Sequence, residues 1–235
     1  MEEVSGLPEY QYKQGKSASA LWGLEAIGYF KDEADIANSP YQTFQAVQPG
    51  DVKFKDQNND SIIDAQDNIV IGNTIPQWTL GFVGTANYRG FDLQFVLSGM
   101  VGRTVYVTNN SMWVLQNNNK ATDIAYGAWE KGVNEDNASY PRLTTLSNKN
   151  NYNSSSLWAR SGDFIRLTNL EVGYSLPSKV LAKIKLKQVR VFVNACNLFS
   201  LDSMKEFNLD PEVPDAGVSG YPVMKVYNTG VNVNF

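Results

Sequence analysis

The sequence contains no histidine and a single cysteine, Cys196. Without histidine, the chain has neither a Ser-His-Asp or Cys-His catalytic system nor a histidine-ligated metal site. One cysteine cannot form a disulfide within the chain or a cysteine-based structural zinc site. These absences leave four open classes of function: carboxylate chemistry, calcium held by oxygen ligands, binding surfaces, and membrane-spanning β structure.

Charge and long apolar runs are also scarce. Charged residues make up 19% of the 235 residues and hydrophobic residues 43%, a balance that indicates neither a disordered tail nor a helical membrane protein. The formal charge of -4 argues against a nucleic-acid partner, which normally requires a basic excess. The first 30 residues lack the basic and apolar regions of a signal peptide, so we expect a protein that is not exported or a sequence that begins within a longer one.

Alternation with a period of two residues is the strongest pattern in the chain, and it predicts β-strands with two different faces. In the first such run, Trp78, Leu80 and Phe82 share one face. Arg89-Gly90 then leaves room only for a tight turn, which predicts an antiparallel hairpin. The predicted strands are 78–88, 91–101, 164–176, 189–199 and 225–235.

The connections between these runs alternate in length. Residues 89–90 and 177–188 form short links, the second with a predicted short helix, whereas 102–163 and 200–224 form long ones. Short periplasmic turns and long extracellular loops are typical of a transmembrane β-barrel. If residue 235 ends at the periplasm, both short links lie there and the long links lie outside. A helical turn is predicted within 120–132.

The composition of the two faces favours a membrane barrel over a soluble β-sandwich, which also shows alternation. The polar faces carry Asn, Thr, Gln, Ser and Gly instead of Lys and Glu. The runs are longer than the usual five or six residues of a strand. Aromatic residues near the run ends suit interfacial girdles, and the terminal Phe235 is the type of signal that the outer-membrane assembly machinery reads.

A second motif, DQNNDSIIDAQD at 56–67, matches the ligand spacing of a twelve-residue EF-hand calcium loop. Ser61 replaces the usual glycine, Asp67 is shorter than the usual glutamate, and the flanking residues look extended. The open alternative is an Asx-rich turn whose side chains cap their own backbone. The candidate Ca²⁺ ligands are Asp56, Asn58, Asp60, Ile62 through its backbone carbonyl, Asp64 and Asp67.

Several blocks of the sequence together resemble the C-terminal region of SusC/RagA-type TonB-dependent outer-membrane transporters. They occur in the order of that family and cover most of the chain from Gly15 onward. The blocks are PGDVKFKDQNNDSIIDAQDNIVIGN (49–73), IPQWTLGFVGTANYRGFDLQFVLSGMVG (75–102), YPRL (140–143), SGDFIRLTNLEVGYSLPSKVLAKI (161–184), VRVFVNACNLFSL (189–201) and the closing YNTGVNVNF.

The resemblance implies an all-β fold, the C-terminal part of a large antiparallel transmembrane β-barrel with long extracellular loops, of the plugged 22-stranded type. Residues 1–77 would form an extracellular loop region with the EF-hand-like turn. Residues 78–235 would contain the last five or so transmembrane strands and their loops. The implied function is nutrient import, not enzymatic catalysis, in the outer membrane of a Gram-negative, Bacteroidetes-like bacterium.

The implied partners are a SusD-like lipoprotein, a glycan or peptide substrate, outer-membrane lipid and, indirectly, TonB. The family's plug and TonB box have no counterpart in these residues, and five strands cannot close a barrel. We therefore expect the remaining N-terminal barrel and plug portion to be a further partner, and this chain to be the last part of the transporter.

Two alternatives remain open from the residues themselves. A soluble calcium-stabilised carbohydrate-binding β-sandwich shares the aromatic residues and the Asp-rich loop. A carboxylate glycosidase needs two carboxyl groups about 5–10 Å apart, and no spacing singles out such a pair. Loop aromatics would either stack on sugar rings or pack in a loop core; they are Trp113, Trp129, Tyr140, Tyr152 and Trp158.

Overall fold

The computed structural model describes residues 7–107, 112–116, 119–207, 209–212 and 223–235. The chain divides into two compact units. The first contains the described residues of 7–75 and 103–161, and the second those of 76–102, 162–212 and 223–235. No helix in the described part of the chain has the length and apolar character needed to cross a membrane.

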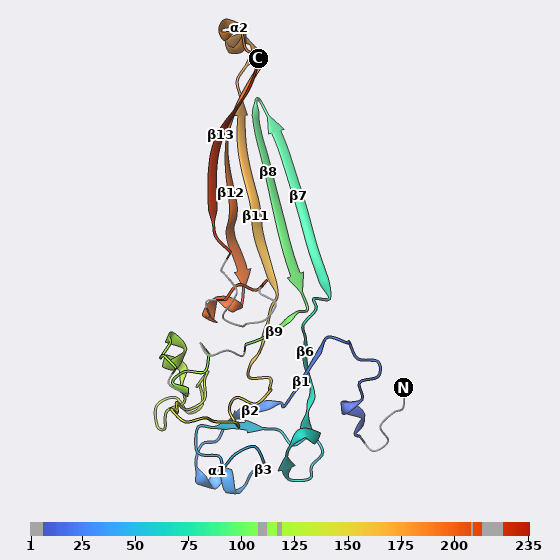
Figure 1. The fold of residues 1–235 in the computed structure, drawn as a ribbon, viewed down its shortest axis with the longest axis vertical. Coiled ribbons are helices and arrows are strands. Elements are labelled where there is room, and N and C mark those ends of the chain that lie inside the picture. The colour runs from blue at the N-terminus through green and yellow to red at the C-terminus, as the bar shows by residue number, and fades with distance from the viewer. Residues whose placement is uncertain (1–6, 108–111, 117–118, 208, 213–222) are drawn as a thin grey trace. The chain divides into compact units, whose positions relative to one another are not determined.

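The second unit is built on a five-stranded antiparallel sheet in the order β13-β12-β11-β8-β7 (Figure 1). All five predicted strands are present, and β12 continues three residues beyond its predicted end. Long alternation, strict in β7 and β8 and ragged in β11, is enough to place these strands, because each has one apolar and one polar face. The strands are β7 (Trp78–Tyr88), β8 (Phe91–Val101), β11 (Phe164–Ser175), β12 (Gln188–Asp202) and β13 (Val226–Asn234).

Both short connections and the end of β13 lie at the same end of the sheet (Figure 1). Arg89 and Gly90 have φ angles of 47° and 87°, the pattern of a two-residue hairpin turn. Helix α2 (Ser178–Ile184) joins β11 to β12 as predicted. The Lys187 amide donates to the Asn234 carbonyl oxygen at 2.9 Å. The predicted grouping of the short links with the last strand is therefore confirmed within this unit.

A β-bulge interrupts the register of β11 with both neighbours between Leu167 and Asn169. The extra residue, Thr168, forms a hydroxyl hydrogen bond of 2.7 Å with Ser98. Because one residue is inserted, Leu167 and Leu170 point to the same face although they are three positions apart. The bulge explains why alternation in this run is ragged in the sequence.

The first unit consists of short strand pairs joined by loops. Its strands are β1 (Ala20–Gly23), β2 (Ala26–Tyr29), β3 (Tyr41–Gln42), β4 (Val52–Phe54), β5 (Ile62–Ile63), β6 (Ile69–Asn73), β9 (Thr104–Tyr106) and β10 (Ala159–Ser161). They pair as β1-β6, β2-β4, β3-β5 and β9-β10, of which only β3-β5 is parallel.

Four buried apolar side chains from β4, β5 and the link between β1 and β2 form a core cluster of the first unit, namely Leu24, Val52, Phe54 and Ile63. Helix α1 (Glu33–Ala37) is capped at its N-terminus by Asp32, whose carboxylate accepts a hydrogen bond of 2.7 Å from the Asp35 backbone amide. The helical turn predicted within 120–132 is a 3-10 helix, Asp123–Gly127. Further 3-10 turns are Glu9–Gln11, Ala65–Asp67 and, in the second unit, Met204–Phe207.

Candidate functional site: a sheet with two chemically different faces

One face of the five-stranded sheet is apolar. Directly paired residues of neighbouring strands lie on the same face, so the pairs Leu80–Gly99, Phe82–Leu97 and Tyr88–Phe91 belong together. The described residues paired along this face are all uncharged. Its central side chains are Leu80, Phe82, Leu93, Phe95, Leu97, Leu170, Val172, Val191, Val193 and Val231.

This apolar face is open over much of its area. Phe82, Val193 and Val231 are 59%, 55% and 59% exposed. Contiguous exposed apolar surface of this extent marks a surface that another apolar medium or partner covers. The face is therefore a candidate contact surface for lipid.

Aromatic residues lie near both ends of the apolar face. Trp78 begins β7, whereas Tyr88, Phe91 and Tyr174 lie at the turn end, where the Phe91 and Tyr174 rings are 4.6 Å apart. The ten residue steps from Trp78 to Tyr88 span about 33 Å along a strand. With a tilt of about 45°, this length covers about 23 Å of membrane depth, close to the apolar band of about 25 Å in outer-membrane barrels.

The opposite face is polar and carries a charged cluster. Arg190 of β12 reaches across β11, where its Nε donates to Asp92 Oδ1 of β8 at 2.9 Å. An Nη atom of the same guanidinium donates to Glu171 Oε1 at 2.7 Å. Beside the cluster, Asn194 Nδ2 donates to Asn169 Oδ1 at 2.6 Å. The charged side chains of this cluster therefore satisfy one another within the sheet.

Gly173 makes the reach of Arg190 possible. A Cβ at this position would lie closer than 3.0 Å to a carboxylate oxygen of Asp92 and to two guanidinium nitrogens of Arg190. By contrast, a Cβ at Gly81 on the same face would meet nothing within 4 Å. The glycine in β11 thus leaves room for the ion pairs that pass over it.

Gly173→Ala should lower the thermal stability of the assembled protein, because the added methyl group displaces Arg190 from Asp92 and leaves partly buried charges without partners. We expect an unfolding temperature several degrees lower in detergent. Gly81→Ala is the matched control and should leave the unfolding temperature nearly unchanged. Equal effects of the two substitutions would contradict the packing role of Gly173.

The candidate calcium ligands lie in a turn whose side chains hydrogen-bond to backbone amides. Asp56 Oδ1 accepts from the Asn59 amide at 2.6 Å, and Asp60 Oδ1 accepts from the Ile62 amide at 2.8 Å. Ser61 has a φ of 65°, so it adopts the left-handed conformation that glycine provides in typical EF-hand loops.

The polar side chains of the other candidate ligands in this loop also hydrogen-bond to backbone amides. Asn58 Oδ1 accepts from the Asp60 amide at 3.0 Å, and Asp64 caps the 3-10 helix Ala65–Asp67. Asp67 is fully buried, and its two oxygens accept from the Gln57 and Asp64 amides. In the described part of the chain, no three acidic or cysteine side chains are placed so that they could hold a metal ion. The calcium site stays a prediction.

Calcium binding by this loop is tested by thermal unfolding with calcium and with a chelator. Asp56→Ala combined with Asp60→Ala should lower stability in both conditions, because the backbone caps are lost. If Ca²⁺ binds, the wild type alone gains stability when calcium replaces the chelator. Identical unfolding of the wild type in both solutions would reject the cation site.

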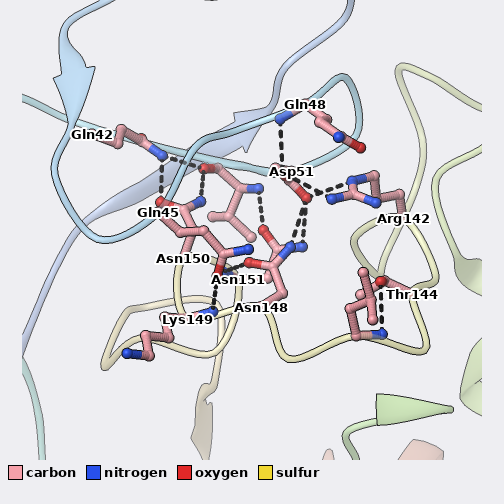
Figure 2. Close-up of polar contacts among 12 residues, drawn as sticks. Gln42, Gln45, Gln48, Asp51, Arg142, Thr144, Asn148, Lys149, Asn150 and Asn151 are labelled. Atoms are coloured by element: carbon pink, nitrogen blue, oxygen red, sulfur yellow. Dashed lines mark hydrogen bonds and ion pairs between the residues drawn. The ribbon is translucent and has the colours of Figure 1, made fainter. Parts of the chain in front are cut away.

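A buried polar network around Asp51 connects two loops of the first unit (Figure 2). Asp51 is completely buried, and its Oδ1 accepts hydrogen bonds from Arg142 Nε at 2.7 Å and from Asn148 and Asn151 Nδ2 at 3.0 and 2.9 Å. Its other oxygen accepts from the Gln48 amide at 2.8 Å. Figure 2 shows these donors directed toward one carboxylate from segments about a hundred residues apart.

The same asparagine run also binds the backbone of β4. Asn151 Oδ1 accepts from the Val52 amide at 2.8 Å, while Asn150 and Gln42 both donate to the Val52 carbonyl oxygen at 2.9 Å. The sequence reasoning missed this arrangement, since residues 148–151 look like any polar loop. The only available signal was the concentration of amide side chains, which occurs equally in exposed turns.

The loop aromatics pack on one another. Tyr140 and Trp158 are buried with ring centroids 5.7 Å apart, and Tyr152 stacks on Trp158 at 5.6 Å. Burial raises the pKa of Tyr140 and of Tyr152, and it raises the pKa of Tyr29 to about 12. These phenols are therefore neutral at physiological pH, and the contacts of Tyr140, Tyr152 and Trp158 are those of a loop core.

The second unit is thus an antiparallel sheet with one apolar and one polar face, and comparison with known proteins shows which folds it resembles. The structure matches the RagAB peptide transporter with a TM-score of 0.69 and 20% identity over 92% of this chain and 22% of that chain. It matches the RagAB peptide importer in the 'open-open' state with a TM-score of 0.64 and 22% identity over 100% of this chain and 25% of that chain. No family model matches.

Curated sequences point to the same group. The chain is 25% identical over 247 residues to TonB-dependent receptor P26 of Formosa agariphila, covering 100% of this chain and 24% of that protein. It is 29% identical over 211 residues to TonB-dependent receptor P39 of the same organism, covering 81% and 19%. The chain therefore spans a quarter or less of the length of these relatives.

The chain is similar in sequence to TonB-dependent receptors and in fold to part of the RagAB transporter, the similarity that its motifs predicted. It is mostly β structure that matches part of the RagA fold, and the described residues do not themselves form a closed barrel. The names of these relatives describe receptors and transporters, in keeping with the expectation that the chain is not an enzyme.

Proposed function

We propose that this chain forms the C-terminal part of the barrel wall of a TonB-dependent outer-membrane nutrient transporter. The observation that carries the proposal is the five-stranded sheet with one uncharged apolar face and one polar, charge-bearing face. A strand in a membrane barrel needs this arrangement, because one face contacts hydrocarbon and the other faces the lumen.

In this arrangement the two edge strands of the sheet, β7 and β13, pair with strands of the remaining N-terminal barrel portion. Unpaired backbone amides cost several kcal/mol each in hydrocarbon, so an open sheet edge is prohibitive there. The similarity to about a quarter of each relative's length supports this assignment. The complete transporter would supply the other strands and a plug.

The topology follows from the common end of the short links. The turn at 89–90, helix α2 and the end of β13 would lie in the periplasm. Residues 1–77 and the long connections would lie outside the cell, and residues 78–235 would contribute the spanning strands. This orientation places the first unit, with its Asp51 network, among the extracellular loops.

Import of a glycan or a peptide is the activity we infer for the complete transporter. The RagAB structures are those of a peptide transporter, and they support a RagB- or SusD-like lipoprotein as partner, with TonB supplying energy. Because the central loop aromatics are buried, we do not assign them to sugar stacking.

Membrane assembly tests the proposal directly. The complete protein, expressed in a Bacteroidetes host, should fractionate with the outer membrane and require detergent for extraction. The β-sandwich alternative expects the 235-residue chain to be soluble and monomeric without detergent. Recovery of such a monomer would overturn the transporter assignment.

A further inference from the structure

A pocket of about 220 Å³ lies in the second unit beside the end of β12. Its wall includes a buried cation, Arg166, and two exposed ones, Lys205 and Lys225, together with Ser200 and Asp210. One water occupies about 30 Å³ in the liquid, and a carboxylate or sulfate group is only a few times larger. The pocket is therefore larger than either group alone. The pocket can therefore hold one charged group and the adjoining atoms of a larger ligand.

The chain itself shows how a carboxylate fits against one wall of the pocket. Two oxygens of Asp210 accept hydrogen bonds of 2.8 Å from the same Nη of Arg166, which is only 4% exposed. Glu212 forms a second ion pair with this guanidinium. The charge of Arg166 is thus balanced within the chain, and the two carboxylates exceed it by one.

The two lysines supply the uncompensated positive charge. The Lys205 ammonium donates one hydrogen bond to the Ser200 carbonyl oxygen, which leaves two N–H groups for another acceptor. Neither Lys205 nor Lys225 forms an ion pair with a carboxylate in the described ranges of the chain. Together with Arg166, Asp210 and Glu212, they give the site a net charge of +1.

A third observation points to an absent ligand group. The Ser200 hydroxyl oxygen is buried, and it has no hydrogen-bond partner among the described residues. A buried hydroxyl without a partner costs free energy that a bound acceptor would recover. Ser200 lies opposite Arg166 in the β11–β12 ladder and is one of the residues that line the pocket together with the two lysines.

We propose that this pocket binds an oxyanion, a carboxylate or sulfate group, carried by the imported nutrient. The role in nutrient recognition rests on the proposed transporter function, whereas anion binding itself does not. Lys205 and Lys225 would provide the charge, and the Ser200 hydroxyl would donate a hydrogen bond. The ligand class is therefore an acidic peptide or an acidic oligosaccharide, which share this group.

The first experiment titrates sodium acetate and sodium sulfate into the purified complete transporter in detergent at low ionic strength. Calorimetry should show saturable binding that weakens by at least about tenfold in the double variant K205Q/K225Q, a change of about 1.4 kcal/mol. K131Q removes an exposed lysine of the first unit and should bind like the wild type. Absence of saturable binding, or equal binding by K205Q/K225Q, would overturn the proposal.

The second experiment displaces the bound anion with two matched pairs of ligands. One pair is a trialanine peptide with a free or an amidated C-terminus, and the other is trigalacturonate or its methyl ester. Displacement by only the charged member of either pair supports nutrient recognition and identifies the source of the oxyanion. Displacement by the neutral members too, or by none of the four, overturns that role.

The two proposals fail separately. If K205Q/K225Q assembles in the outer membrane but wild-type protein shows no anion binding, only the pocket is refuted. If the wild-type protein does not assemble in the outer membrane, the transporter assignment is refuted, whatever the calorimetry shows.

Discussion

Arginine in place of Phe82 should block assembly of the transporter in the outer membrane. Phe82 lies near the middle of β7 on the uncharged face, where a lipid-facing arginine costs about 2–4 kcal/mol at the bilayer midplane. Leu80→Arg should act in the same direction. The measurement is the amount of folded, protease-resistant protein in the outer-membrane fraction.

The matched control is Thr85→Arg, three residues further along the same strand but on the polar face. An arginine there would face the lumen and should allow assembly close to the wild-type level. Normal assembly of Phe82→Arg, or equal failure of both variants, would show that the two faces have been assigned incorrectly.

Asp51→Ala should have the second largest effect, this time on the first unit. Removal of the buried carboxylate leaves Arg142, Asn148, Asn151 and the Gln48 amide without their common acceptor. Breaking a buried ion pair from one side costs about 3–5 kcal/mol. We expect faster hydrogen exchange and proteolysis in residues 42–54 and 142–151 of the complete protein, while outer-membrane assembly continues.

Asp136→Ala is the control for this experiment. Asp136 also forms an ion pair, with Lys31 at 2.6 Å, but both side chains are mostly exposed, and exposed pairs contribute little to stability. Hydrogen exchange should therefore be nearly unchanged in Asp136→Ala. An equally small effect of Asp51→Ala would show that the loops are held together by their apolar contacts alone.

The strands of the five-stranded sheet could be predicted from the sequence because they depend on patterns among neighbouring residues. In 78–101 a strict two-residue period surrounds Arg89-Gly90, so strand limits, face and turn are all determined by neighbouring residues. The end of β12 was placed three residues early. Its last residues pair with Phe164 and Ile165 of β11. The alternation within one strand does not show where pairing with a neighbouring strand extends it.

The Asp-rich loop shows a limit of motif reasoning. Aspartate and asparagine at alternate positions can direct oxygens toward a cation or toward backbone amides, and both uses favour the same tight turn. The hydrogen bonds of Asp56, Asp60 and Asp67 show that the second use operates in this structure. Spacing alone could not distinguish the two uses, which is why thermal unfolding with calcium and with a chelator is needed.

Local periodicity in the sequence by itself determined the strands of the large sheet and their apolar and polar faces, and the blocks of residues from 49–73 onward carried the family resemblance. Only the tertiary structure decided that Asp51 meets residues 142–151, that Arg190 passes over Gly173 to Asp92, and that Ser200, Lys205 and Lys225 line one pocket. A repeat of two residues is set by the geometry of one strand. Contacts between polar side chains far apart in the chain have no such period, because they depend on how the folded backbone brings the segments together.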